Sequence, residues 1–358
     1  MNIFLSKAFV PALLAFIVSW ITTPLVIRLT WKLGLIDDPK RERHPKKIHT
    51  YPVPRGGGIA VFISIFISSL LFLPLDKHAI GILIGALLIT ILGTFDDKYN
   101  LNPYLRLLFQ FISAAAPIAS GIGIAFITIP FFGSLDLSHP QINIALFGDL
   151  KSIWIFSDLF ALVWIVMLMN FLNMGAKGVD GQLPGVTVIA GATIASLSLK
   201  YSADITQWPV ILLASITTGA FLGFLPFNVF PQKIMPSFSG SNLAGYFLGV
   251  LSILSTTKVG TLFVVLAIPL IDTGYTIARR VAKGKSPVWG DTGHLHHKLL
   301  KKGWSKKQVA YFYWIITLFM GILALNLNTS YKFYTIVGTA VLVGGLLLWL
   351  TQNSKQKS

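Results

Sequence analysis

Two adjacent carboxylates, Asp96 and Asp97, close an apolar run that begins near Ile80. Adjacent carboxylates repel each other, and placing them at a lipid boundary costs free energy. Such a pair suits a divalent cation, or a division of labour between a metal ligand and a general base. An acidic helix end facing water is the alternative. It is disfavoured because a single acid would serve there, and because Arg106 and Gln110 follow inside the next apolar run.

A second set of polar side chains lies in NFLNMGAKGVDGQLPG, residues 170–185. Asn170 and Asn173 are about one helical turn apart at the end of an apolar run, so they share a helix face. Two carboxamides at membrane depth are costly unless they bind each other, a ligand or a metal. Lys177 and Asp180 follow in a glycine-rich segment. Hydrogen bonding between helices is the alternative role for the asparagines.

The basic segment 36–58 is punctuated by prolines and ends in three glycines, 56–58, that open a helix. Glycines at a helix start let a phosphate approach the helix N-terminus, and Arg55 stands beside them. Attachment of this segment to anionic lipid headgroups is the alternative interpretation.

The basic segment 279–305 holds three of the seven histidines, in the motif HLHH: His294, His296 and His297. A zinc site is disfavoured, because the chain has no cysteine and the neighbouring residues are basic. Imidazoles among arginines and lysines suit phosphate oxygens better. A solvated basic loop on the lipid surface is the alternative.

The composition indicates which kind of structural element must position these polar residues. The chain has 358 residues, 54% of them hydrophobic and 12% charged, with a mean hydropathy of +0.72. These values predict an all-α, polytopic integral membrane protein with a single domain over 1–358. The absence of cysteine excludes disulfide and thiolate chemistry. About eleven apolar runs are predicted to span the membrane: 4–29, 57–73, 79–95, 105–125, 154–172, 186–199, 208–227, 241–256, 259–276, 308–325 and 333–351.

The distribution of positive charge predicts the orientation. The net charge is +16, and most lysines and arginines fall in alternate loops, which reports membrane orientation rather than nucleic-acid binding. An N-terminus outside puts the loops with the polar motifs in the cytoplasm, at 28–56, 96–106, 173–185, 228–240 and 276–307. On the outer side, β-type residues broken by Pro, Gly and Asp predict a small β-hairpin at 126–152.

Four segments carry a resemblance to a known family: GTFDDKYNLNPYLRLLFQ, IHTYPVPRGGG, GFLPFNVFPQKI and HLHHKLL. They are similar to motifs of the polyprenyl-phosphate N-acetylhexosamine-1-phosphate transferases, glycosyltransferase family 4, a superfamily shared with phospho-MurNAc-pentapeptide transferase. The resemblance covers nearly the whole chain. HLHH is similar to the His-x-His-His of the hexosamine branch rather than the His-His-His of the muramyl branch.

The resemblance implies transfer of a sugar-1-phosphate from a UDP-sugar to undecaprenyl or another polyprenyl phosphate, releasing UMP. The reaction would be assisted by Mg²⁺ and would be the first membrane step of a cell-surface glycan pathway. The catalytic residues implied are Asp96, Asp97 and Asp180. The implied substrate and phosphate ligands are Arg55, Asn170, Lys177, His294, His296 and His297. The implied metal ligand is Asn173, together with Asp96, Asp97 or Asp180.

Two positions depart from the family pattern. The family usually has an aspartate, thought to bind the metal, where this chain has Phe238 in SFSGS, and a phenyl ring cannot ligate Mg²⁺. Lys177 stands at the first aspartate position of the asparagine-rich motif, after a one-residue insertion. Three interpretations stay open: Asn173 with an acid still holds Mg²⁺, Lys177 replaces part of its charge as a point cation, or transfer activity is lost and only binding remains.

The expected partners are UDP-sugar, polyprenyl phosphate and membrane lipid, with a homodimer as a further expectation and no nucleic acid. The expected location is the plasma membrane, with several spans and the active site facing the cytoplasm. A catalytically impaired lipid- or nucleotide-binding protein and a phospho-MurNAc-pentapeptide transferase are the alternatives. A transporter is disfavoured, because there is no inverted repeat and only Asp272 lies within an apolar run.

Overall fold

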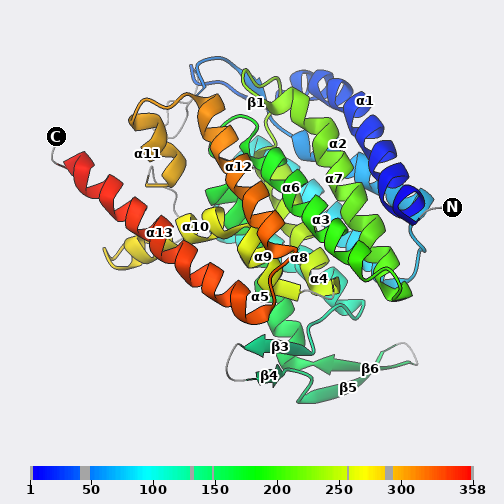
Figure 1. Cartoon of the computed structure of the whole chain (residues 1–358). Coiled ribbons are helices and arrows are strands. Elements are labelled where there is room, and N and C mark those ends of the chain that lie inside the picture. The colour runs from blue at the N-terminus through cyan, green and yellow to red at the C-terminus, as the bar shows by residue number, and fades with distance from the viewer. Residues whose placement is uncertain are drawn as a thin grey trace.

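The computed structural model describes residues 3–40, 49–129, 133–146, 149–255, 258–286 and 293–355. Most of these residues are helical, and the helices form one bundle with small strand pairs at its ends (Figure 1). Two short helices, η1 (Phe4–Phe9) and η2 (Ile205–Gln207), accompany the α-helices. The α-helices are α1 (Val10–Lys32), α2 (Gly57–Phe72), α3 (Lys77–Tyr99), α4 (Pro103–Ala119), α5 (Ile155–Gly175), α6 (Gln182–Lys200), α7 (Trp208–Asn228), α8 (Ser237–Leu254), α9 (Lys258–Val265), α10 (Ala267–Val281), α11 (Leu295–Lys301), α12 (Lys306–Ala324) and α13 (Thr329–Lys355).

Each of the eleven predicted apolar runs contains a helix. Among the described residues, 8 helices are long and apolar enough to cross a membrane, or 9 if the bent pair α9 and α10 counts as one span. The helices in the other two runs, α2 and α4, have 16 and 17 residues and are short for a bilayer core of about 30 Å. These features are those of a polytopic membrane protein. Eleven spans and an outer N-terminus stay predictions.

The run 259–276 is predicted as one span, but its helix is broken. α9 and α10 meet at an angle of 87°. Pro269 lies in the first turn of α10, where its missing N–H is tolerated, and its ring would clash with a continuous helix from α9. The break is therefore expected at this proline.

The strands form three antiparallel pairs at two ends of the bundle. β3 (Phe126–Ile129) pairs with β4 (Gly133–Asp136), and β5 (Gln141–Leu146) pairs with β6 (Asp149–Trp154). The region 126–152 thus holds two strand pairs where one hairpin was predicted; residues 130–132 and 147–148 lie outside the described residues. β1 (Ile36–Asp37) and β2 (Val53–Pro54), which the sequence did not predict, pair near the opposite end (Figure 1).

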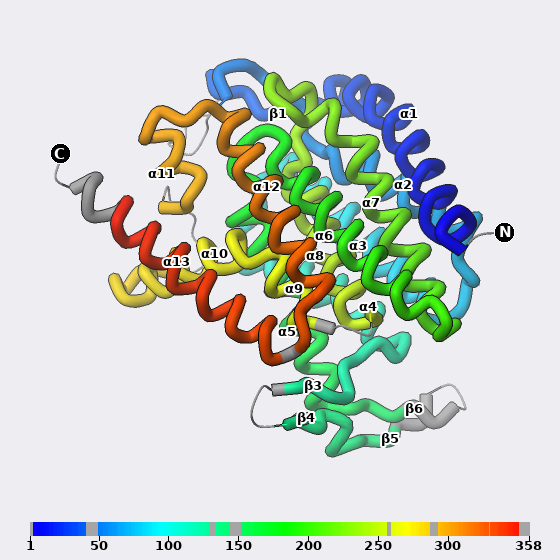
Figure 2. Tube along the Cα trace, viewed as in Figure 1, coloured from blue at the N-terminus to red at the C-terminus, as the bar shows by residue number. Residues whose placement is uncertain are grey.

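Parts of the two basic segments also lie outside the described residues, at 41–48 and 287–292. In the traced chain, α1 covers one flank of the bundle and α13 the opposite flank (Figure 2).

Helix α8 lies at the centre of the bundle, and its residues from Ser237 to Ile253 are all buried. It packs against α5, α3 and α2. Glycines allow this close packing of helices. A methyl group added at Gly93 of α3 would lie only 2.7 Å from Ser239 Cα, and one added at Gly58 of α2 would lie only 2.5 Å from the amide nitrogen of Gly240. Close backbone contact therefore brings the C-terminal end of α3 and the start of α2 onto the start of α8.

The contact between α3 and α8 predicts that Gly93→Ala lowers the thermal unfolding temperature in detergent. The added methyl must push two backbones apart, which costs about 1–3 kcal/mol. Gly338→Ala on α13 is the matched control, because no atom lies within 4 Å of the added methyl there and alanine favours a helix. Equal melting of Gly93→Ala and wild type would contradict the packing.

Candidate active site

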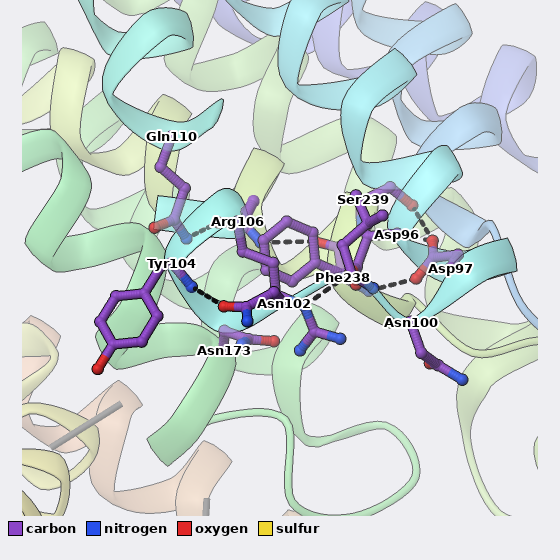
Figure 3. Close-up of polar contacts among 12 residues, drawn as sticks. Asp96, Asp97, Asn100, Asn102, Tyr104, Arg106, Gln110, Asn173, Phe238 and Ser239 are labelled. Carbon is purple, nitrogen blue, oxygen red and sulfur yellow. Dashed lines mark hydrogen bonds and ion pairs between the residues drawn. The ribbon is translucent and has the colours of Figure 1, made fainter. Parts of the chain in front are cut away.

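The acidic pair meets the start of α8. Asp97 Oδ1 accepts a hydrogen bond from the amide of Phe238 at 2.8 Å, and Asp97 Oδ2 accepts one from the Ser239 hydroxyl at 2.8 Å (Figure 3). The first amides of a helix have no partners within the helix and carry partial positive charge. Asp97 therefore caps α8 from a different helix, with both carboxylate oxygens engaged.

Asp96 points to Arg106 of α4. Arg106 Nε lies 2.6 Å from Asp96 Oδ1, which also accepts a hydrogen bond from the amide of Leu101 at 3.0 Å. Asp96 Oδ2 accepts no hydrogen bond from a described residue. The guanidinium carbon of Arg106 lies 5.4 Å from the centre of the Phe238 ring. Phe238, which replaces the aspartate that the resemblance implies, thus supplies a ring face to a cation (Figure 3).

Arg55 ties the first basic segment to the end of α3. Its Nη1 donates to the carbonyl of Asp97 at 3.1 Å and to Asn100 Oδ1 at 2.9 Å, and its Nη2 lies 3.4 Å from Asp37 Oδ2. The next residue, Gly56, has a φ of 95°, which favours glycine and lets the chain turn into α2.

The predicted carboxamides belong to a buried hydrogen-bond chain across three helices. Asn170 donates to Gln110 at 2.8 Å, Gln110 donates to Asn242 at 2.5 Å, and Asn242 donates to the carbonyl of Phe238 at 2.8 Å. Asn170 therefore forms hydrogen bonds between helices, which is the alternative role considered for it in the sequence.

Asn173, the predicted metal ligand, sits closer to the start of α8 along the same face of α5. Its Oδ1 lies 2.8 Å from the hydroxyl of Ser241. The asparagine is part-buried and lies on the same side of the start of α8 as Arg106 in Figure 3.

Lys177 is half-buried in the loop between α5 and α6, within electrostatic reach of Asp97, Asp96, Arg106 and Arg55. Its Nζ makes no hydrogen bond or ion pair with any described residue. Burial lowers the pKa of Lys177 to about 8, with Asp97 opposing the shift. Its ammonium is therefore mostly charged at neutral pH.

Asp180 contacts the start of α12. Its Oδ1 lies 3.6 Å from Lys306 Nζ at the start of α12, and its Oδ2 is buried without a hydrogen-bond partner among the described residues. Burial raises the pKa of Asp180, and Lys306 lowers it. No hydrogen bond or ion pair in the described part of the chain joins Asp180 to Asp96 or Asp97.

The histidine motif is anchored by Asp272 of α10. Asp272 Oδ2 lies 3.0 Å from His294 Nδ1, and Asp272 Oδ1 accepts the amide of Leu295 at 2.8 Å. His296 stacks on His294 with ring centres 5.6 Å apart and lies 4.3 Å from the ring of His297. The sequence singled out Asp272 only as a lone intramembrane acid, and its pairing with His294 gives it a positioning role.

His296 connects the histidine motif to the loop of Lys177. A methyl group added at Gly178 would overlap the His296 ring, so the ring lies directly on the backbone beside Lys177. His296 is buried and its Nδ1 has no hydrogen-bond partner among the described residues. Burial holds the pKa of His296 well below its usual range, so this imidazole is neutral at pH 7.

Sequence reasoning gave no role to Ser239, Ser241 and Asn242 of α8. All three are fully buried polar residues inside an apolar helix. Their polarity at intramembrane positions was the available signal, but nothing in the spacing indicated which helix they would contact.

The described side chains do not form a complete set of ligands for a magnesium ion. No group of three His, Asp or Glu side chains among the described residues could hold a metal. Asp97 is engaged by α8, Asp96 by Arg106 and Asp180 by Lys306, while Phe238 and Lys177 cannot serve as ligands. The predicted Mg²⁺ is therefore given no step in the mechanism proposed below.

Comparison with known proteins agrees with the resemblance. Residues 79–256 match glycosyl transferase family 4. The chain is 30% identical over 339 residues to a probable undecaprenyl-phosphate N-acetylglucosaminyl 1-phosphate transferase of Bacillus subtilis, covering 91% of this chain and 87% of the relative. It is 28% identical over 365 residues to a decaprenyl-phosphate N-acetylglucosaminephosphotransferase of Mycolicibacterium smegmatis, covering 93% and 84%.

A third relative represents the muramyl branch. The chain is 30% identical over 346 residues to a phospho-N-acetylmuramoyl-pentapeptide-transferase of Borrelia garinii, covering 87% of this chain and 92% of the relative. The similarity to relatives of both branches extends over most of the chain, and the family match includes the acidic pair and the start of α8. The chain therefore belongs to glycosyl transferase family 4.

Proposed function

We propose that the protein transfers a sugar-1-phosphate from a UDP-sugar to a polyprenyl phosphate. The observation that carries the proposal is the meeting of the acidic pair with the start of α8, where three cationic side chains, Arg55, Arg106 and Lys177, gather beside two carboxylates. Cations at this density suit the phosphates of both substrates. The names of the relatives in Bacillus and Mycolicibacterium support polyprenyl phosphate as acceptor.

In the proposed reaction an oxygen of the polyprenyl phosphate attacks the sugar-linked phosphorus of the UDP-sugar. A new P–O bond forms, the bond between that phosphorus and the oxygen of UMP breaks, and UMP leaves with the bonding electrons. Asp96 takes any remaining proton from the attacking phosphate through Oδ2. Asp97 holds the start of α8 in place, and Arg106 and Lys177 offset the charge on the transferred group.

N-acetylglucosamine is the sugar that the first two relatives' names support. The phospho-MurNAc-pentapeptide reaction is a second candidate, because the Borrelia relative is also 30% identical to this chain. Comparing both UDP-sugars under one set of conditions separates the two. Loss of transfer with retained binding is the third outcome that such a comparison can reveal.

The proposed setting is the plasma membrane, with the site on the cytoplasmic side and the product feeding a cell-surface glycan. The excess of lysine and arginine in the loops around the site supports this orientation. The homodimer stays a prediction.

The proposal predicts that purified protein releases UMP from UDP-N-acetylglucosamine only when undecaprenyl phosphate is present. Chromatography of nucleotide products measures the release, and omission of the lipid is the control. Release without lipid would indicate hydrolysis instead. No release with either UDP-sugar, from protein that still binds UDP, would favour the impaired, binding-only alternative.

The assignment of Asp96 predicts that Asp96→Asn lowers the transfer rate by about 100-fold or more, because an amide cannot accept the proton. Asp76→Asn is a matched control, since Asp76 caps the far end of α3 and asparagine caps equally well. Initial rates at saturating substrate measure both variants. Asp96→Asn transferring as fast as Asp76→Asn would remove Asp96 from the reaction.

Asp97 has a different expected signature. In Asp97→Asn, an NH₂ group replaces one of the two carboxylate oxygens. An NH₂ group cannot accept a hydrogen bond, so the side chain can no longer accept from both the Phe238 N–H and the Ser239 hydroxyl. We expect this variant to lose both thermal stability and transfer rate, whereas Asp96→Asn should lose mainly rate. Full transfer activity in Asp97→Asn would show that the cap on α8 is dispensable.

A further inference from the structure

The site has three cationic side chains, and two of them have hydrogen-bond or ion-pair partners among the described residues. Arg106 is paired with Asp96 and lies against Phe238, and Arg55 bonds to the end of α3 and to Asp37. Lys177 alone has no hydrogen bond or ion pair with a described residue. It is nevertheless partly withdrawn from water, and a buried ammonium without a partner is costly. Asp97 and Asp96 stabilise its charge only through space, which leaves the ammonium available to a ligand.

The loop that carries Lys177 is held rigidly. Gln182 Oε1 accepts hydrogen bonds from the amides of Gly178 and Val179 at 3.0 and 3.1 Å, and Gln182 Nε2 donates to the carbonyl of Gly175 at 3.0 Å. The ring of His296 covers Gly178. One glutamine thus holds the backbone on both sides of Lys177, so the attachment point of the lysine side chain is fixed before any ligand arrives.

The carboxylates near Lys177 do not neutralise it. Asp97 directs both oxygens to the start of α8, and Asp96 directs Oδ1 to Arg106. Arg55 is paired with Asp37 and Arg106 with Asp96, so no carboxylate among the described residues forms an ion pair with the Lys177 ammonium. No group of three His, Asp or Glu side chains among the described residues could hold a divalent cation, and a phosphate arriving here meets the Lys177 ammonium and the Arg106 guanidinium.

We propose that Lys177 is the cation that binds the diphosphate of the nucleotide substrate, in place of a divalent metal held by carboxylates. The identity of that ligand rests on the proposed function. A compact ammonium binds a phosphate oxygen as a point charge, as lysines do at other phosphate sites. The consequence is that a nucleoside diphosphate binds this protein without added metal.

Calorimetric titration of the full-length protein with UDP, in EDTA and in millimolar Mg²⁺, tests the proposal. We expect wild type to bind UDP in both conditions with affinities within about 3-fold, because the protein's own charge does the work. Lys177→Met should weaken binding in EDTA by about 10- to 100-fold, the size of one charge-assisted contact. Lys177→Arg should recover most of the loss.

Two controls separate binding from folding. Lys233→Met removes a lysine that is exposed on another loop of the same predicted face and should leave UDP binding unchanged. Thermal unfolding of Lys177→Met should match or exceed that of wild type, because an unpartnered cation is removed. A lower unfolding temperature with unchanged UDP affinity would make Lys177 a structural counterion to Asp97 and overturn the proposal.

The outcomes also separate this inference from the proposed function. UDP binding that requires Mg²⁺ and is unaffected by Lys177→Met would overturn the inference while leaving the transferase in place. No UDP binding in either condition would overturn both. Metal-independent binding that Lys177→Met abolishes and Lys177→Arg restores is the result we expect.

Discussion

The structure depends on one contact, the carboxylate of Asp97 at the N-terminus of α8. It satisfies the Phe238 amide at the start of α8, which would otherwise be buried without a partner. Gly93 and Gly58 make the contact possible by bringing α3 and α2 close to α8. Arg55, which bonds to the carbonyl of Asp97, and Asn242, which bonds to the carbonyl of Phe238, are positioned by the same junction.

That junction also decides the electrostatics of the site. Both oxygens of Asp97 are bonded to the start of α8 and Oδ1 of Asp96 is bonded to Arg106, which leaves Asp96 Oδ2 as the one oxygen of the acidic pair without a hydrogen bond from a described residue. Phe238 adds no charge and instead supports Arg106. The cationic side chains therefore set the electrostatic potential that a ligand meets at the site. A positive potential suits two phosphorylated substrates that must approach each other despite their own negative charge. Two differences from the family pattern, Phe238 and Lys177, thus both make the charge of the site more positive.

The sequence predicted the fold class well because each apolar run is a local signal. It could not show that α9 and α10 bend apart, although Pro269 marked the place, nor that 126–152 folds as two strand pairs. At the site it identified the acidic pair, Lys177 and the histidines from their residue types. It could not assign partners: the capping of α8 by Asp97, the Asp272–His294 pair and the turn of Asp180 toward Lys306 are contacts between distant segments.

The central claim is that the bond between the two phosphates of a UDP-sugar is broken here and the sugar-linked phosphate passes to a lipid. Incubation with UDP-N-acetylglucosamine that carries ³²P in the sugar-linked phosphate, followed by organic extraction, tests it most directly. The account predicts that the label enters the organic phase with undecaprenyl phosphate and that the released UMP is unlabelled. Label that stays in the aqueous phase, in UDP-sugar or in free sugar phosphate, would contradict it.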